Sequence, residues 1–481
     1  MFSARREVDL STRRLNHEFA ELRTLENGGI DTVISGNVSR LRWDQRIARK
    51  TSPVSGLRPS TLRFYSVTAF LVGFLQPLAI TLVGKLLISE LLVLVVLVHS
   101  AVTFALAHVL PASIPSPRTL IFLLICQLLA LLSYIVSDLW HQSLPSDMIR
   151  GWLRMIFLLV DTFVLALLFG AGIRPFVLLL VGLGFSSLFM FLEGPLFGDY
   201  WKFCFGYPLT IVILLSVPRL LGFWATVAAS LALGVLHLLM GYRSLGMECL
   251  LLAGLLLSRS LPPLFRKYLF IVCVPIAFVG LPWTTLNVLL ADTEGSATRS
   301  NVERSAMLTA AWEGFLASPW VGNGSWFSQS DVWDNFLLIR SQKEVETGEK
   351  LGFDPHNFEG KAIHSQILTA LAEGGLLGGT FFLAYTVLII LGFWFLLTEA
   401  SWHWLMPIRL SILISSFCAV FMSPFSGTSR LEIGMAAALV VVLLDERKAL
   451  LLRSASPSPG PKRPRVSAPL RLSKAHLTRR T

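Results

Sequence analysis

Long apolar stretches without charge are the feature that most constrains how this chain can fold. Residues 64–83, 120–136 and 376–397 contain no Asp, Glu, Lys or Arg. A helix needs about 20 consecutive, mostly apolar residues to cross the hydrocarbon core of a bilayer. Across the chain, 54% of residues are hydrophobic and only 15% are charged, whereas about a quarter of a soluble domain is charged. The sequence therefore predicts an all-α fold, a polytopic bundle of transmembrane helices.

About twelve spans can be placed along the chain by this length rule, and the short sixth and eighth are the least distinct. The predicted spans are residues 64–83, 86–110, 120–136, 151–169, 175–192, 205–217, 220–240, 244–257, 268–290, 376–397, 405–422 and 433–444. They divide the chain into a basic N-terminal segment (1–60), nine spans (61–290), a large loop (291–375), three spans (376–444) and a basic tail (445–481). The loop is expected to contain short helices, and the Pro- and Ser-rich tail is expected to be disordered.

Basic residues are concentrated at the two ends of the chain, and they predict its orientation. The net charge is +11, with eleven Lys and Arg in residues 1–60 and ten in residues 445–481. Residues 291–373 instead hold 12 acids and 6 bases. Because cytoplasmic segments carry the excess of Lys and Arg, both ends are expected in the cytoplasm and the large loop outside it. Attraction to anionic lipid headgroups accounts for the basic ends, so no nucleic-acid partner is expected.

The cysteines indicate packing inside the membrane. They are Cys126, Cys204, Cys249, Cys273 and Cys418. All five lie in or beside apolar segments, and no pair has the spacing of a metal site. Neither a disulfide framework nor a metal centre is predicted, and no other cofactor is expected.

The large loop begins with a predicted helix that places an arginine beside apolar side chains. Ser300 and Glu303 have the spacing of a capping box, so this helix is expected to cover residues 301–317. Its apolar stripe consists of Leu308, Ala311, Trp312 and Phe315. Arg304 lies one turn before them on the same stripe. An arginine in this place needs a carboxylate or an anionic ligand, or else it snorkels to lipid headgroups. The charged segment 341–352 is expected to be a solvated insertion.

Three further polar residues lie at or inside the predicted spans. His364 stands where the loop passes into the helix of the tenth span, and histidine is the usual proton-transfer group near neutral pH. A structural role at the membrane surface is its alternative. Arg243 lies at the outer end of the eighth span, where it binds a ligand or anchors the helix. Asp161, near the middle of the fourth span, is either a proton-relay acid or a polar contact.

Several short motifs follow one another in order across residues 241–379. They are Tyr-Arg-Ser at 242–244, Arg304-x-x-Met-x-x-Ala-Ala-Trp312, Ser318-Pro-Trp-Val-Gly-Asn-Gly324, Asp354-Pro-His-Asn357, His364-Ser-Gln-Ile-Leu368 and Leu371-Ala-Glu-Gly-Gly-Leu-Leu-Gly378. Together they resemble the O-antigen ligase and polysaccharide polymerase superfamily of bacterial inner-membrane proteins. The Asp-Pro-His-Asn motif is similar to that of exopolysaccharide polymerases in the group. The rest of the chain matches only as a helical bundle of many spans.

The resemblance implies a metal-independent membrane glycosyltransferase whose glycan donor is carried on undecaprenyl diphosphate. The acceptor is another glycan or glycolipid in polymerases and lipid A core in ligases. Carried over by position, Arg243 and Arg304 would hold the diphosphate, and His364 would be the catalytic residue that acts on the acceptor hydroxyl. The resemblance also implies the bacterial inner membrane as location, an active site facing the periplasm, and a chain-length regulator and a flippase as partner proteins.

The assignment of the histidine has one alternative. The family usually has Asn after its histidine, and in this chain Asn follows His356 whereas Ser365 follows His364. His364 is preferred because the Glu373-Gly-Gly-Leu-Leu-Gly motif follows it at the family's spacing. His356, Glu373 and Arg430 are therefore candidate supporting residues.

Two other classes of function are compared with the enzyme. A transporter or flippase of lipid-linked sugars would show internal repeats and broken helices at matching positions, and no clear repeat is visible. Asp161 is the main feature in its favour. A structural scaffold would leave Arg243, Arg304 and His364 unexplained. Within the enzyme class, the Asp-Pro-His-Asn motif favours a polymerase over a ligase.

Overall fold

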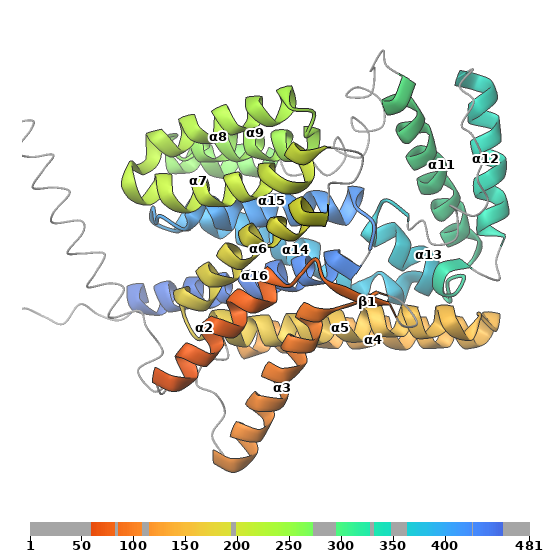
Figure 1. Cartoon of the computed structure of the whole chain (residues 1–481), viewed down its shortest axis with the longest axis horizontal. Coiled ribbons are helices and arrows are strands. Elements are labelled where there is room, and N and C mark those ends of the chain that lie inside the picture. The colour runs from red at the N-terminus through yellow and green to blue at the C-terminus, as the bar shows by residue number, and fades with distance from the viewer. Residues whose placement is uncertain are drawn as a thin grey trace, which may run out of the picture.

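The computed structural model describes residues 59–81, 85–107, 115–193, 199–272, 295–327, 331–347, 363–425 and 427–455, most of them helical (Figure 1). The elements are α2 (Pro59–Phe74), β1 (Ala79–Thr81), β2 (Lys85–Leu87), α3 (Ile88–Ala107), α4 (Pro117–His141), α5 (Pro145–Gly170), α6 (Ile173–Glu193), η2 (Trp201–Phe205), α7 (Gly206–Leu220), α8 (Gly222–Leu239), α9 (Arg243–Ser258), α11 (Gly295–Ala317), η3 (Ser325–Phe327), α12 (Val332–Thr347), α13 (Gln366–Gly378), α14 (Thr380–Trp394), η5 (Phe395–Glu399), α15 (Met406–Met422) and α16 (Gly427–Ala455). Both η2 and η5 are single π-helical segments, and η3 is a 3-10 turn.

Long apolar helices make up much of the structure. Within the described residues, six are long and apolar enough to cross a membrane: α4, α5, α6, η2 with α7, α8, and α14 with η5. Shorter apolar helices are α15 and most of α3. The chain is therefore an all-α membrane protein, as predicted, and one small hairpin is the exception in the part of it that the structure describes. The predicted ninth span, residues 268–290, lies outside the described residues beyond residue 272.

The hairpin interrupts the first predicted span, residues 64–83. In the structure α2 ends at Phe74, and Ala79–Thr81 pairs antiparallel with Lys85–Leu87. Pro77 explains the early end, because proline lacks an N–H and disfavours helical geometry at the residue before it. The predicted boundary of this span was therefore wrong although its sequence is apolar throughout.

The helices run between two ends of the bundle. The hydrogen bonds of two arginines define the first end. Arg259 at the end of α9 donates hydrogen bonds to the carbonyl oxygens of Leu396 and Ala400, the latter at 2.8 Å. Arg266 donates to the carbonyl oxygen of Leu397 at 3.0 Å. These carbonyls belong to the end of η5 and the residue after it, so α9 and α14 with η5 finish at the same end. We call it the Arg259 end.

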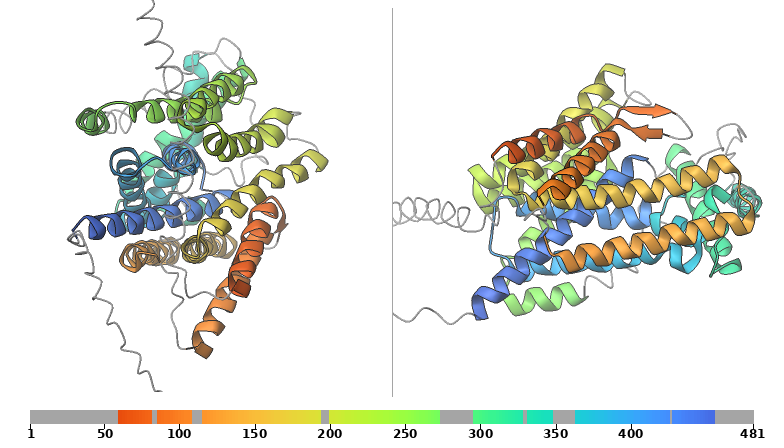
Figure 2. Two further views of the ribbon diagram at one scale, coloured as in Figure 1. Left: turned by 90° about the vertical axis from the view of Figure 1, so that its left-hand side faces the viewer. Right: turned by 90° about the horizontal axis from the view of Figure 1, so that it is seen from below.

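The second end, the Glu373 end, is where α13 meets α4, α5 and α15. Ser365 Oγ donates to the carbonyl oxygen of Val420, in the last turn of α15, at 3.2 Å. Tyr134 on α4 and Arg154 on α5 both bond Glu373 on α13. The N-terminus of α15 contacts Arg259, so α15 joins the two ends. Figure 2 shows α4 and α5 side by side along the bundle, with α11 to α13 at one end.

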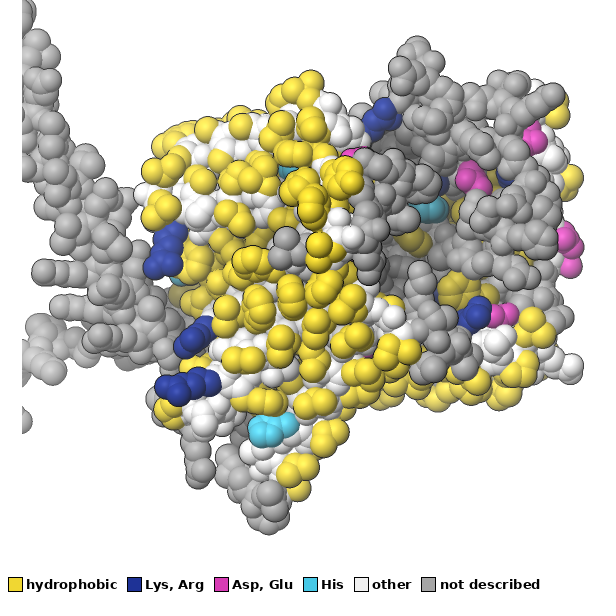
Figure 3. Space-filling model, viewed as in Figure 1, with side chains coloured by type: hydrophobic (Ala, Val, Ile, Leu, Met, Phe, Trp, Pro, Cys, Tyr) yellow, Lys and Arg dark blue, Asp and Glu magenta, His cyan; other side chains and the backbone are white. Residues whose placement is uncertain are grey.

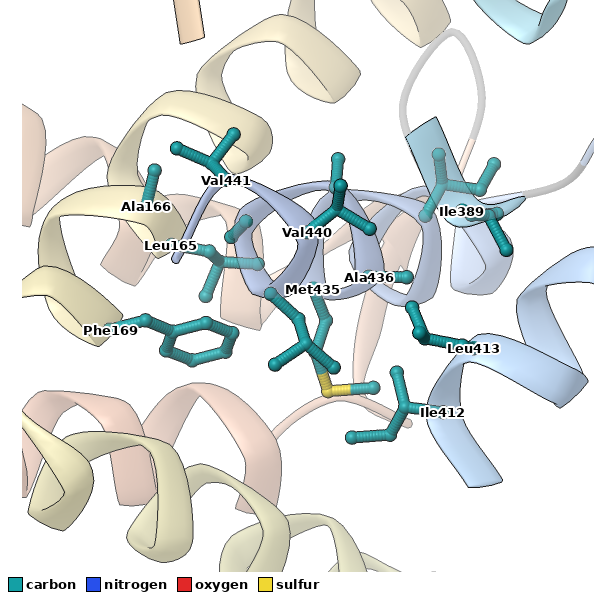
Figure 4. Close-up of a cluster of buried hydrophobic side chains, with 14 of the residues drawn as sticks. Leu165, Ala166, Phe169, Ile389, Ile412, Leu413, Met435, Ala436, Val440 and Val441 are labelled. Atoms are coloured by element: carbon teal, nitrogen blue, oxygen red, sulfur yellow. The ribbon is translucent and has the colours of Figure 1, made fainter. Parts of the chain in front are cut away.

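A core of close helix contacts surrounds α16, the predicted twelfth span. Figure 4 shows side chains of α5, α14, α15 and α16 packed together: Leu165, Ala166, Phe169, Ile389, Ile412, Leu413, Met435, Ala436, Val440 and Val441. Gly434 brings the α16 backbone against α5, where an added Cβ would lie 2.9 Å from Cβ of Asp161. Small residues permit such close approach of helices inside membranes. This core fixes α5 and α16, and with them the polar residues at the Glu373 end.

The large loop folds into the helices α11 and α12, which pack on α13 with a small core of their own. The buried members are Ala306, Met307, Ala310, Ala311, Phe327, Val332, Phe336, Ile363 and Ala372. One prediction for the loop was wrong. Because α11 begins at Gly295, Ser300 lies inside the helix and is not its cap. The segment expected as a solvated insertion supplies the last turns of α12, since residues 341–347 are helical, and Ser341, Gln342 and Val345 in it are exposed.

Charged side chains gather at opposite ends of the face drawn in Figure 3. The left edge shows Lys and Arg without Asp or Glu, whereas the right side, around α11 and α12, shows Asp and Glu together with some Lys and Arg. The left edge is the side on which α16 ends (Figure 1). The two ends of the bundle thus differ in charge on this face, with apolar side chains between them.

Candidate functional site

Glu373 on α13 is the centre of a buried polar cluster at the Glu373 end. Its carboxylate accepts hydrogen bonds from Tyr134 Oη at 2.8 Å and from the backbone N–H of Trp326 at 3.0 Å. Arg154 Nη2 forms an ion pair with the same carboxylate. The side chains of Arg154 and Glu373 are 3% and 2% exposed. A buried ion pair costs much desolvation unless further hydrogen bonds satisfy it, and here both carboxylate oxygens have donors.

Arg154 is also enclosed by aromatic rings. Its guanidinium carbon lies 4.6 Å from the ring centroid of Phe425, 5.3 Å from that of Trp326 and 5.5 Å from that of Tyr134. These distances are within the range of a cation–π contact. The arginine therefore connects α4, α5, η3 and Phe425, which lies two residues before α16. Its Nε, however, has no hydrogen-bond partner among the described residues.

A second carboxylate, Asp138, fixes the turn η3 to α4. It accepts hydrogen bonds from the backbone N–H of Ser325 at 2.6 Å and from Ser325 Oγ at 2.9 Å. Trp152 Nε1 on α5 donates to it at 2.8 Å. Asp138 is fully buried, so all three donors act where water is excluded. The turn that carries Trp326 is thus held from both sides, by Asp138 and by Glu373.

Two of the short sequence motifs, Ser318–Gly324 and Leu371–Gly378, are joined by backbone hydrogen bonds in this cluster. The N–H of Asn323 donates to the carbonyl oxygen of Ala372 at 2.9 Å, and the N–H of Leu376 donates to that of Pro319 at 2.7 Å. Glycine is required on both sides of the contact. Gly322 has φ +85°, and a Cβ there would lie 2.3 Å from the carbonyl oxygen of Glu373. Gly375 has φ +65°, and its Cβ would lie 2.5 Å from the carbonyl oxygen of Trp320.

The turn η3 has an unusual backbone and borders a small cavity. Trp326 and Phe327 have φ of 63° and 55°. Bulky residues rarely adopt this left-handed conformation, and residues that do are found more often at functional sites. The cavity has a volume of 10 Å³, which is about the space for one water. Its lining consists of Arg154, Trp326, Phe327, Trp333, Ile363, Thr369 and Glu373. Arg154 Nε and Trp326 Nε1 are unpaired donors in this lining among the described residues.

His364, the predicted catalytic residue, lies between this cavity and the start of α13. Its side chain is half-buried, and its neighbour Ile363 lines the cavity. Ser365 is the N-cap of α13, because Leu368 N–H donates to Ser365 Oγ at 3.3 Å. Thr369 Oγ1 donates to the Ser365 carbonyl oxygen at 2.6 Å. The backbone on either side of the imidazole is therefore anchored.

The two predicted diphosphate-binding arginines lie on α9 and α11. Arg243 is the first residue of α9 and is exposed; since α9 finishes at the Arg259 end, its start faces the other end. Arg304 on α11 is exposed as well. The expectation that Arg304 faces the apolar side was wrong, because the buried side of α11 carries Met307 and Ala310. Partial desolvation lowers the pKa of Arg304, and neighbouring Glu303 opposes that shift.

Of the three supporting candidates, only Glu373 has a place in this cluster among the described residues. Arg430 forms a buried ion pair with Glu90, with Nε–Oε1 at 2.6 Å and Nη2–Oε2 at 2.9 Å, and it lies 5.7 Å from the Phe157 ring. This pair ties the start of α16 to that of α3. His356 lies outside the described residues.

Sequence inspection missed the partners of Glu373, although one signal was available. Arg154 stands within the predicted fourth span, and ionisable residues inside a span are functional candidates by default. Asp138 and Tyr134 gave weaker signals, since each lies near the end of the third span. Trp326 could not be found this way, because its importance comes from its backbone geometry.

Comparison with known proteins assigns no further residue to this site. No protein-family model and no curated protein matches the chain. Within the described residues, no group of three or more His, Cys, Asp or Glu side chains could hold a metal ion. The groups of this site that can carry a charge or transfer a proton are its arginines, carboxylates and histidine.

Proposed function

We propose that this chain is a membrane glycosyltransferase of the bacterial inner membrane. It transfers an oligosaccharide from undecaprenyl diphosphate to an acceptor glycan, as a polymerase of surface or exopolysaccharide or, alternatively, as an O-antigen ligase acting on lipid A core. One observation supports the proposal: Arg243 begins α9, whose other end lies at the Arg259 end, Arg304 lies on α11, which packs on α13, and His364 directly precedes the N-cap of α13.

The proposed reaction is a single displacement at the anomeric carbon. The acceptor hydroxyl oxygen forms a bond to that carbon, the bond from the carbon to the diphosphate oxygen breaks, and His364 takes the hydroxyl proton. The leaving diphosphate gains negative charge, which Arg243 and Arg304 offset, because guanidinium groups match phosphate oxygens in geometry and charge. General-base catalysis of this kind contributes about 10²–10⁴-fold in rate.

The local structure at His364 supports its choice over His356. Ser365 occupies the position after the histidine where the family usually has Asn. In the structure this residue is the N-cap of α13, and Ser and Asn are equally good N-caps. The departure from the family pattern therefore preserves the local function of the residue.

We also propose twelve spans with the Glu373 end in the periplasm. Eleven described helices, α2 to α9 and α14 to α16, would be spans. Residues 259–266 belong to the Arg259 end whereas α11 packs on α13, so the chain changes ends between residues 266 and 295. A span there would be the twelfth, and the start of α2 and the end of α16 would then both lie at the Arg259 end. The basic edge in Figure 3 supports a cytoplasmic location for that end.

A transporter of lipid-linked sugars is the second candidate, and Asp161 is the observation in its favour. Asp161 is fully buried, and neither carboxylate oxygen has a hydrogen-bond partner among the described residues. Such a group persists inside a span when it carries a proton. If it is a static neutral acid, Asp161→Asn keeps wild-type glycan levels in cells. Loss of all surface glycan in a stably inserted Asp161→Asn protein would favour proton-coupled transport instead.

The surface-glycan profile of a deletion strain tests the proposal. Loss of long chains, with single repeats retained on lipid A, identifies a polymerase. Long polymer that accumulates on undecaprenyl diphosphate identifies a ligase. An unchanged profile in a strain that normally expresses the protein contradicts both forms of the proposal.

A further inference from the structure

One side of α11 is apolar and exposed. The buried side of this helix, with Met307 and Ala310, packs in the small core of the large loop. Trp312 and Leu316 lie one turn apart on another side, and both are exposed. Trp320, in the turn that follows the helix, is 73% exposed. Large apolar side chains that gather on a surface mark a contact with another molecule or with a membrane. We call Trp312, Leu316 and Trp320 the Trp320 surface.

The Trp320 surface continues the lipid-facing side of α14. The N–H of Leu376, in the last turn of α13, donates to the carbonyl oxygen of Pro319 at 2.7 Å, which places Trp320 beside the start of α14. Leu376 is exposed, and so are Leu383 and Val387, which lie one turn apart on α14. Together with η5, α14 is long and apolar enough to cross the membrane, so its exposed apolar side chains face lipid. The Trp320 surface therefore borders a surface that lipid already covers.

A second tryptophan marks the level at which the bilayer ends. Trp140 lies at the end of α4, a helix long and apolar enough to span, and it is 73% exposed. The next residue, His141, donates a hydrogen bond from Nε2 to the carbonyl oxygen of Gly322 at 2.9 Å. The end of α4 thus contacts the turn that contains Trp320. Tryptophan is enriched at the membrane–water interface, where its ring lies at the level of the lipid headgroups. Both tryptophans fit this level.

The direction of α11 agrees with a position on the membrane surface. It runs across the end of α4 and α5 rather than parallel to them (Figure 1). Since α4 and α5 are membrane-spanning helices, α11 lies close to the plane of the membrane surface. Thr309 and Glu313 form a polar edge of the helix beside Trp312, and Glu313 is exposed. A helix with an apolar side toward lipid and a polar side toward water is typical of the interface.

We propose that the Trp320 surface binds the bilayer itself, with Trp312, Leu316 and Trp320 inserted among the lipid headgroups at the Glu373 end. The partner is a phospholipid surface, and burial of apolar area drives the binding. The large loop is then anchored at the membrane beside α14. This binding does not depend on the reaction that the protein catalyses.

The anchoring gives Arg304 a defined level, and this consequence rests on the proposed function. Arg304 is exposed and precedes Trp312 by eight residues on α11, which is about 12 Å along the helix. Because the helix lies in the plane of the surface, Arg304 stays near the level of the headgroup phosphates. Guanidinium groups bind phosphate oxygens. The diphosphate of a lipid-linked donor lies at that level as well, so the donor reaches Arg304 without leaving the bilayer.

Spin labels at single cysteines test the binding to lipid. The full-length protein without native cysteines is placed in phospholipid nanodiscs with a nitroxide at Leu316→Cys or Trp320→Cys. Oxygen concentrates in lipid, whereas a polar nickel chelate stays in water. Both sites are expected to show the oxygen-to-nickel accessibility ratio of Val387→Cys, the lipid-facing reference on α14. Gln342→Cys is the matched water reference, since Gln342 is exposed on α12, and its ratio should be lower.

Two results of the labelling would overturn the proposal. The ratio of Gln342→Cys at both test sites would place the Trp320 surface in water. Low accessibility to both reagents would show that a protein, either another chain or a second copy of this one, covers the surface. Each labelled protein must keep the wild-type unfolding midpoint.

Bromine-bearing phospholipids test the same contact in the unlabelled protein. They should quench the part of the tryptophan emission that Trp320→Phe removes, and emission from Trp320 that stays unquenched would contradict the insertion. Neither measurement uses glycan transfer. If His364→Ala still makes long glycan, the proposed function fails while the membrane contact stands, and a Trp320 surface found in water leaves the test of His364 unaffected.

Discussion

The ion pair between Glu373 and Arg154 connects segments that are far apart in the sequence. They are 219 positions apart in the chain, yet their ion pair joins α13 to α5 and fixes the backbone of Trp326 through the carboxylate. Ile363, beside His364, lines the same cavity. The pair is therefore a positioning element for the proposed catalytic histidine.

The losses of stability from removing Arg154 and from removing Glu373 should not add. Arg154→Met leaves Glu373 buried without its cation, and such single removals cost about 3–5 kcal/mol. In the double variant Arg154→Met/Glu373→Gln no buried charge is left unpaired, so its loss should be smaller than the sum of the two single losses. Thermal unfolding of the purified protein in detergent measures all four members of this cycle. Additive losses would show that the two side chains are not coupled.

At the residue scale, the sequence indicated Glu373 but not its role. Its motif and its place after His364 marked it as a supporting candidate. Its partner Arg154 lies on another helix, and side-chain pairs across such distances in sequence follow from packing alone. The expected orientation of Arg304 failed for a related reason: the side of α11 that is buried depends on where α12 and α13 lie.

The positions of individual helices were predictable where the length of an apolar stretch determines where a helix lies. The cores of α4, α5, α6 and α8 lie within a few residues of the predicted spans, because lipid imposes length and composition. Boundaries set by local contacts were less accurate. The early end of α2 follows from Pro77 and the hairpin, and α12 was missed because its buried side consists of scattered residues such as Val332, Phe336 and Arg340.

The contact between the turn after α11 and the kink in α13 depends on two glycines. Gly322→Ala and Gly375→Ala each force a Cβ to within about 2.5 Å of a carbonyl oxygen, at a positive φ. Each is expected to lower the unfolding midpoint strongly and to reduce the amount of inserted protein. Gly184→Ala on α6 is the matched control, since its Cβ would meet nothing within 4 Å. Wild-type stability of Gly322→Ala would show that the two segments do not hold each other.

For the whole molecule, the proposed topology places the two ends of the bundle on opposite sides of the membrane. Glu313 on α11 and Lys448 near the end of α16 are exposed markers of the two ends. In a variant without native cysteines, Glu313→Cys should react with a membrane-impermeant maleimide added from the periplasmic side, whereas Lys448→Cys should react only after the membrane is opened. Labelling of both sites from one side would contradict the orientation.

The central claim, that His364 carries out glycan transfer at the Glu373 end, has one most direct measurement. The deletion strain is complemented with wild type, His364→Ala or His403→Ala, and the surface glycan of each is resolved by size. His403, in the segment after η5, controls for the loss of an imidazole at the Arg259 end. We predict that His364→Ala inserts normally and makes no high-molecular-weight glycan, while His403→Ala makes the wild-type profile. Long polymer at wild-type levels from His364→Ala would contradict the account.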